Sequence, residues 1–174
     1  MTLDEQSHLG GAPFPLYLRK LDKKSRWGHP DDAIADRVAV ATTETFPYPG
    51  NCFSLYLIRS MDDLRRVVVA LNLRRNRRNN DIDLVGFLES EITASEIQIL
   101  QVPGETDCAA ANVLHVDISS SSQDSFSRLC RLAMNAGREA VRIGKTSVAE
   151  MLAEQINLGC EAITDNAACG CRHA

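Results

Sequence analysis

The sequence predicts a single α+β domain in which a mixed or mainly antiparallel sheet is flanked by about three helices. Its 174 residues match the length of one ordinary domain. With 44% hydrophobic and 24% charged residues, the composition is close to the globular average, which excludes a disordered or fibrous chain. Short alternating segments typical of strands are interspersed with segments of helical period, and this mixture favours the α+β class.

We expect residues 14–159 to form this domain. Residues 1–13 are polar and glycine-rich, so they are predicted to be a flexible N-terminal segment. Residues 160–174 hold several cysteines and show no clear period, so they are predicted to form a cysteine-rich C-terminal tail.

The strands are predicted from short segments that are β-branched or alternate between apolar and polar residues. In chain order they are Leu16–Lys20, Val38–Thr42, Phe53–Leu57, Asp83–Leu88, Glu96–Val102 and Val113–Ile118. A short helical turn is expected just before the second strand, at Asp31–Arg37. The strongest turn signal of the chain is Pro47–Asn51, where two prolines, a glycine and an asparagine fall together.

Three helices are predicted from apolar residues that recur every three or four positions. The first has Ser60 as its N-cap and presents one apolar stripe, formed by Leu64, Val67, Val68 and Leu71. The second follows a run of serines and ends at Gly137, and its apolar side holds Phe126, Leu129, Cys130, Ala133 and Ala136. The third is expected to begin at Ser147, with Glu150 completing a capping box, and to end before Gly159.

Charge is segregated along the chain. The stretch from Arg59 to Arg78 has seven arginines and two acids, whereas residues 79–127 contain nine acids and no lysine or arginine. Such a distribution indicates either a partner that is steered by charge or ion pairing within the molecule.

The basic stretch supplies the candidate partner-binding residues. They are Arg65, Arg66, Arg74, Arg75, Arg77 and Arg78. Arginine forks fit phosphate groups, so RNA or DNA binding by the Arg74–Arg78 loop is one alternative function. Against it, the stretch lacks the aromatic residues that stack on single-stranded bases, and the isoelectric point is about 5.6. The simpler interpretation is a solvated helix end whose arginines pair with the acidic half of the chain.

A second alternative is a thiol-dependent enzyme. His115 and Asp117 are two residues apart on a predicted strand, so both side chains project from one face. The carboxylate would orient the imidazole as a general base, with Cys108 as the nucleophile. Many inert proteins contain such a combination, and alternation alone predicts that His115 and Asp117 are polar surface or edge residues of a half-exposed strand.

The C-terminal tail contains a candidate metal site. Cys160, Cys169, Cys171 and His173 provide three sulfurs and one imidazole, and four such ligands are the set that zinc binds tetrahedrally. A C-x-C pair is a weaker signal than the C-x2-C pairs of common structural zinc sites. A tail without metal is therefore the simpler interpretation, and no cofactor is predicted.

The leading prediction is a non-enzymatic accessory protein that binds another macromolecule, most simply another protein, through its charge-segregated surfaces. The longest aliphatic run, Val67–Leu71, is far shorter than the ~20 residues that cross a bilayer, so no membrane span is predicted. The first residues are acidic and lack the pattern of a secretory signal, so the cytoplasm is the predicted compartment.

Overall fold

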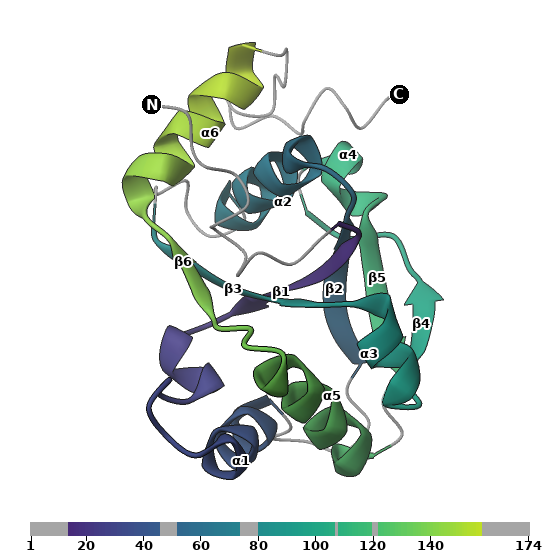
Figure 1. Cartoon of the computed structure of the whole chain (residues 1–174). Helices are drawn as coiled ribbons and strands as arrows, with labels where there is room; N and C mark the ends of the chain where they lie inside the picture. Colours follow the sequence, from purple (N-terminus) through teal and green to yellow (C-terminus); the bar gives the residue numbers. More distant parts are fainter. Residues whose placement is uncertain (1–13, 46–51, 74–79, 107, 120–121, 158–174) are drawn as a thin grey trace.

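An antiparallel sheet of six strands organises the molecule (Figure 1). The computed structural model describes residues 14–45, 52–73, 80–106, 108–119 and 122–157. The strands are β1 (Leu16–Leu21), β2 (Cys52–Ile58), β3 (Ile82–Phe87), β4 (Gln98–Gln101), β5 (His115–Ser119) and β6 (Val141–Ile143). Their spatial order is β4-β5-β2-β1-β3-β6, and every neighbouring pair is antiparallel. This architecture confirms the predicted α+β class and the antiparallel sheet.

Helices cover both faces of the sheet. In the described residues they are α1 (Ile34–Thr45), α2 (Met61–Leu73), α3 (Glu89–Ala94), α4 (Ala109–Asn112), α5 (Gln123–Asn135), α6 (Lys145–Asn157) and a 3₁₀ turn, η1 (Lys24–Trp27). Figure 1 shows α2, α4 and α6 on one side of the sheet and α1, α5 and η1 on the other. We call these two sides the α2 face and the α5 face.

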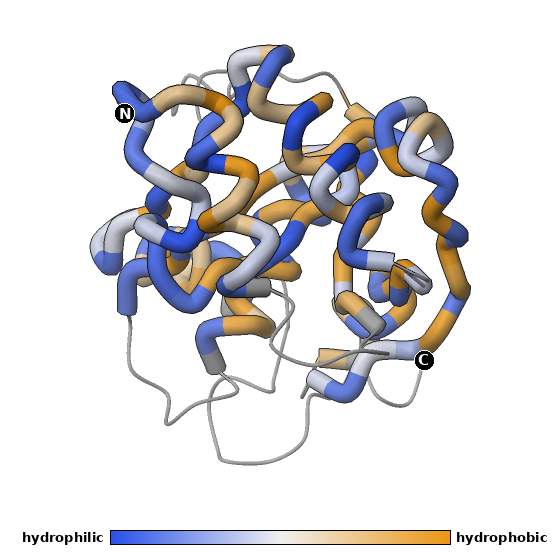
Figure 2. The backbone as a smooth tube through the Cα atoms, turned by 90° about the horizontal axis from the view of Figure 1, so that it is seen from below, coloured by the Kyte–Doolittle hydropathy of each residue, from blue (hydrophilic) through white to orange (hydrophobic). Residues whose placement is uncertain are grey.

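Each face has its own hydrophobic core. On the α2 face, residues such as Leu16, Ile58 and Val68 pack together and are fully buried. On the α5 face, the core is more aromatic and includes Trp27, Phe87 and Phe126. Figure 2, viewed from below, shows helical tubes that change between hydrophilic and hydrophobic within each turn, as expected for helices with one buried side.

The three predicted helices are present as α2, α5 and α6. The N-cap expected at Ser60 is confirmed, since Ser60 Oγ accepts the backbone N–H of Asp63 at 3.2 Å. Ser122, in the run of serines before the second helix, accepts the backbone N–H of Ser125 at 3.1 Å. Gly137 follows α5 with a φ of 73°, the left-handed conformation that ends many helices. The predicted start of the third helix at Ser147 is wrong, because α6 already begins at Lys145.

The predicted strand at Val38–Thr42 is also wrong, because this segment is the middle of α1. Its β-branched residues favoured a strand locally, but Val38, Ala41 and Thr42 are the buried positions, and this i, i+3, i+4 spacing is helical. They pack against α5 on the α5 face of the sheet. Tertiary packing therefore outweighed local propensity. The helical turn expected at Asp31–Arg37 is instead the start of α1, which runs from Ile34 to Thr45.

Two short strand predictions shift by a few residues. The segment Glu96–Val102 contributes only Gln98–Gln101 to the sheet, since Glu96 adopts a φ of 59° that breaks the extended chain before it. The predicted strand at Val113–Ile118 begins instead at His115. The turn predicted at Pro47–Asn51 and the two predicted terminal segments lie outside the described residues.

No helix in the described part of the chain is both long and apolar enough to span a bilayer.

Candidate functional site

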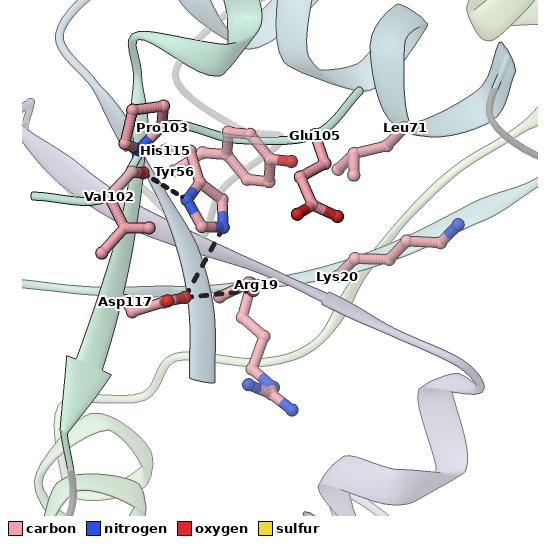
Figure 3. A pocket seen from close by; sticks show the side chains of 10 residues that line it. Arg19, Lys20, Tyr56, Leu71, Val102, Pro103, Glu105, His115 and Asp117 are labelled. Atoms are coloured by element: carbon pink, nitrogen blue, oxygen red, sulfur yellow. Dashed lines mark hydrogen bonds and ion pairs between the residues drawn. The ribbon is translucent and has the colours of Figure 1, made fainter. Parts of the chain in front are cut away.

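A polar pocket opens on the α2 face, between the C-terminal end of α2 and the loop that follows β4 (Figure 3). Its volume is about 500 Å³. The lining residues come from β1, β2, β5, α2 and the loop, and they are Arg19, Lys20, Ser54, Tyr56, Leu71, Val102, Pro103, Glu105, His115 and Asp117. We call this cavity the His115 pocket.

The imidazole of His115 is held in one orientation. Its Nδ1 lies 2.7 Å from the carbonyl oxygen of Val102, and because a carbonyl only accepts, Nδ1 carries the proton and donates it. In the neutral ring, Nε2 is therefore an acceptor. Nε2 lies 3.6 Å from Asp117 Oδ1, beyond hydrogen-bond length, and only 8% of the His115 surface is exposed. In the neutral ring, this orientation directs the Nε2 lone pair toward the Asp117 side of the pocket.

Asp117 is positioned by its neighbour across the sheet. Ser54 lies directly opposite it in the β2–β5 register, and Ser54 Oγ donates to Asp117 Oδ1 at 3.2 Å. The next pair on the same face is Tyr56 with His115, whose rings meet edge to face with centroids 5.2 Å apart. Two cross-strand pairs therefore build one wall of the pocket.

The loop between β4 and α4 is held by Asn112. Its side chain accepts the backbone N–H of Thr106 at 2.8 Å and donates to the Thr106 carbonyl at 2.9 Å. Gly104 passes so close that a Cβ there would lie 2.9 Å from Asn112 Oδ1 and 3.0 Å from the Cβ of His115. A side chain at position 104 would thus displace either the loop or the imidazole. This clamp fixes the backbone on both sides of Gly104, including the Val102 carbonyl and Glu105.

Acceptors outnumber cations in the pocket. Glu105 and Asp117 contribute carboxylates, and Figure 3 shows the Glu105 carboxylate facing the same space as the imidazole. Lys20 supplies the one ammonium group among the lining residues. The Arg19 side chain points away from His115 in Figure 3 and lies over the ring of Phe53, 4.5 Å from its centroid. Burial there lowers the pKa of Arg19 to about 10.

A second cavity of about 410 Å³ adjoins the first and shares Lys20 and Leu71 with it. Its acids are largely engaged in other contacts. Asp83 forms a double hydrogen bond with Arg142, at 2.7 and 2.9 Å, and these bonds hold the pKa of Asp83 below its usual value. Asp81 accepts the backbone N–H of Lys145 at 2.8 Å. The His115 pocket is therefore the better candidate for a binding site.

The structure brings two of the predicted catalytic residues together. His115 and Asp117 share one face of β5, as alternation predicted. The simpler interpretation of surface or edge residues is wrong for His115, which is buried on the second strand from the edge of the sheet. The exposed edge position is taken by β4, which covers this strand.

Cys108 occupies a different environment. It is 5% exposed and packs in the α2-face core, and it is not among the residues that line the His115 pocket. Cys130, which was expected in the core, is fully buried on α5, and burial raises the pKa of its thiol. Neither sulfur belongs to a disulfide among the described residues. A nucleophilic role of Cys108 stays a prediction.

The described arginines of the basic stretch form local ion pairs. Arg65 contacts Asp62 at 3.1 Å and Glu154 of α6 at 3.3 Å, and Arg66 lies 3.8 Å from Asp63. These three carboxylates lie on α2 and α6, outside the acidic stretch. The other four predicted partner-binding residues lie outside the described residues; they are Arg74, Arg75, Arg77 and Arg78.

The acidic stretch pairs mainly with arginines that follow it in the chain. Asp83 binds Arg142, and Glu91 forms a buried ion pair with Arg138. Glu96 lies 3.5 Å from Arg128. The simpler interpretation was that arginines of the Arg59–Arg78 stretch neutralise these acids. In these three pairs the arginine comes instead from residues 128–142.

The proposed zinc ligands also lie outside the described residues; they are Cys160, Cys169, Cys171 and His173. Within the ranges that the structure describes, no group of three or more His, Cys, Asp and Glu side chains is arranged to hold a metal ion.

Sequence reasoning missed most of the pocket wall. Ser54, Tyr56 and Glu105 were not singled out, because they are separated from His115 by 10 to 61 positions in the chain. The available signal was the alternation within the predicted strand Phe53–Leu57. Ser54 and Tyr56 fall on the face opposite Phe53 and Leu55. Only the strand register shows that they meet Asp117 and His115.

Comparison with protein-family models, with curated proteins and with solved structures gave no match for this chain.

Proposed function

We propose that this protein works by binding another polypeptide and that it takes a basic side chain of that partner in the His115 pocket. The proposal keeps the predicted interaction role but transfers it from the arginine stretch to the sheet. The observation that carries it is the convergence of a fixed imidazole acceptor, His115 Nε2, with the carboxylates of Asp117 and Glu105 in one cavity.

The chemistry of this set favours a ligand that donates several hydrogen bonds and carries positive charge. A carboxylate accepts only, and so does the unprotonated Nε2 of a neutral imidazole. A guanidinium group has five N–H donors in a planar fork and matches carboxylates in a bidentate manner. Lys20 lines the same cavity and the Arg19 guanidinium is turned toward Phe53, so two carboxylates and one ammonium group remain to interact with a ligand. An arginine or lysine side chain satisfies these acceptors.

Exposed apolar residues beside the pocket support a macromolecular ligand. Six large hydrophobic side chains are exposed in the described residues, and three of them lie around the β4–β5 corner: Leu100 at 39%, Val102 at 38% and Val113 at 74%. Apolar surface next to a charged pocket is typical of a protein interface. The net charge of −4 adds long-range attraction for a basic partner.

Nucleic-acid binding by the arginines remains a separate prediction with its own test. Counterion release makes such binding fall steeply with salt, in proportion to the number of phosphates contacted. Replacing Arg74, Arg75, Arg77 and Arg78 with serine would then remove most of that salt dependence.

Calorimetric titration with N-acetyl-arginine N-methylamide tests the proposed function. We expect saturable binding to the wild-type protein and at least about tenfold weaker binding to Asp117→Asn, because a neutral amide loses the charge-assisted hydrogen bonds. The citrulline analogue, which has the same shape without the charge, is the ligand control.

Asp124→Asn is the matched protein control, since Asp124 is an exposed acid in the first turn of α5 and the change in net charge is the same. Equal affinities of the wild-type protein and Asp117→Asn, or equal binding of the arginine and citrulline ligands, would contradict the proposal.

A further inference from the structure

The outer edge of β4 and the His115 pocket are placed to act together. We infer that the partner polypeptide binds as an additional strand along β4 and that its basic side chain crosses over Leu100 to reach Asp117 and His115. This inference rests on the proposed function and adds the mode of binding and the sequence pattern of the partner.

The edge itself provides the backbone partners. β4 is the first strand in the sheet order and pairs with β5 alone among the described strands, and Figure 1 shows it at the margin of the sheet. In an antiparallel pair, alternate residues direct their N–H and C=O groups away from the neighbour. An extended peptide satisfies these outward groups by adding a strand.

The two edges of the sheet differ in a way that selects β4. At the opposite edge, β6 carries Arg142, half of whose side chain is exposed, and the strand passes almost directly into α6. Charged residues of this kind protect an edge from pairing. The segment Gln98–Val102 has no charge and is rich in β-forming residues. A partner strand therefore meets no charge to bury at β4.

Register and spacing place the pocket within reach of an added strand. Leu100 lies directly opposite Asp117, so the two side chains share one face. An added strand would lie two strand spacings from β5, about 9.6 Å. A long basic side chain on that face lays its apolar stem on Leu100 and Val102 and presents its charged end to the Asp117 carboxylate. The exposure of Leu100 and Val102 is explained by this contact.

The same geometry defines the sequence of the partner. Side chains two residues apart lie on one face of a strand, so the residues at i−2 and i+2 from the basic residue also face the α2 side. They are placed beside Leu100 and Val102, where apolar or β-branched side chains pack best. The expected segment is extended and has the form apolar-x-Arg-x-apolar.

A synthetic peptide of this form tests the inference, with the sequence acetyl-Thr-Val-Thr-Arg-Thr-Val-Thr-amide. Two further versions carry backbone N-methyl groups, one on the odd-numbered residues and one on the even-numbered residues. Since only one set of amides faces β4, we expect one version to lose affinity by about tenfold or more and the other to bind like the parent peptide.

The outcomes separate this inference from the proposed function. If both methylated peptides bind like the parent while Asp117→Asn still weakens binding, the pocket recognises the side chain but strand addition is wrong. If the parent peptide binds no better than N-acetyl-arginine N-methylamide, the edge contributes nothing and the inference is also overturned. Replacing Leu100 with threonine, a residue that suits an exposed strand, should weaken the parent peptide severalfold and the small ligand less, because only the peptide also places flanking valines beside Leu100.

Discussion

The two faces of the sheet are formed by the same strands but differ in how completely helices and apolar side chains cover them. On the α5 face, alternate residues such as Phe53, Leu55 and Val116 are buried in one cluster with residues of α1 and α5. On the α2 face, the core covers only part of the sheet, and the remaining positions are polar, with Ser54 and Asp117 paired across β2 and β5. One face is closed by packing, and the other leaves a cavity.

Polar groups on the two faces also serve different ends. On the α5 face, Trp27 donates to the Arg138 carbonyl at 3.2 Å, and Arg37 contacts Glu139 at 2.6 Å, so these groups connect the chain to itself. In the His115 pocket, one imidazole nitrogen is used to hold the ring and the other is left facing the cavity. The polar groups of the α5 face thus link parts of the chain to one another, whereas those of the His115 pocket line a cavity.

The largest effect is expected on the closed face. Phe126 is 1% exposed and stacks on Phe53, with ring centroids 5.0 Å apart. Phe126→Ala should lower the free energy of unfolding by about 3–5 kcal/mol, because the change removes buried surface and leaves a cavity. Urea unfolding measures this loss. Val113→Ala is the control. Val113 is the most exposed large hydrophobic residue in the described part of the chain, so the change should alter stability by less than about 0.5 kcal/mol. Similar losses in both variants would contradict a closed core on the α5 face.

A smaller loss is expected at His115. Sequence alternation alone predicts that His115→Gln is tolerated, but the ring is buried and bonded to the Val102 carbonyl. The variant should therefore lose about 1–2 kcal/mol of unfolding free energy, the usual cost of removing one partner of a buried hydrogen bond. Chemical denaturation checks the value, and an unchanged midpoint would show that the ring does not hold the loop.

We expect the Asp83–Arg142 pair, at the β6 edge, to make a pH-dependent contribution to the stability of the fold. Because Arg142 lowers the pKa of Asp83 in the folded protein, the pair stabilises the fold above the ordinary aspartate pKa of about 3.9, and this stabilisation is lost as the pH falls below that value. Arg142→Gln should thus be less stable than the wild-type protein at neutral pH and approach it in acid. Thermal unfolding from pH 7 to pH 2 tests the sign. A difference that grows in acid would be the opposite result.

The smallest effect on stability is expected for Ser54, an exposed residue of the pocket wall. Ser54→Ala removes an exposed hydroxyl, so unfolding free energy should change by less than about 0.5 kcal/mol. Ligand affinity should nevertheless fall, because Asp117 loses the group that orients it. Parallel urea unfolding and calorimetric titration of this variant separate the two effects. A large stability loss without a change in affinity would make Ser54 a structural residue.

The sequence predicted the elements with a clear period but not the site that they form. The helices α2 and α5 follow from apolar stripes and caps within one segment, such as Ser60 with Leu64 and Val67. α1 was mistaken for a strand in part because β-branched residues dominate its middle. The pocket depends on contacts between β2 and β5, which are about 60 residues apart, and on a loop held by Asn112. Local pattern carries no information about such pairings, whereas His115 and Asp117 were found together because they are close in the chain.

We expect a basic ligand to engage His115 Nε2 as a hydrogen-bond acceptor inside the pocket. Nitrogen NMR of the imidazole, recorded while N-acetyl-arginine N-methylamide is added at neutral pH, tests it most directly. We expect a saturable shift of the Nε2 resonance with the proton retained on Nδ1, in the wild-type protein and in Asp124→Asn, and a loss of that shift in Asp117→Asn. An Nε2 resonance that does not move, while signals elsewhere on the surface do, would show that the ligand does not engage this nitrogen.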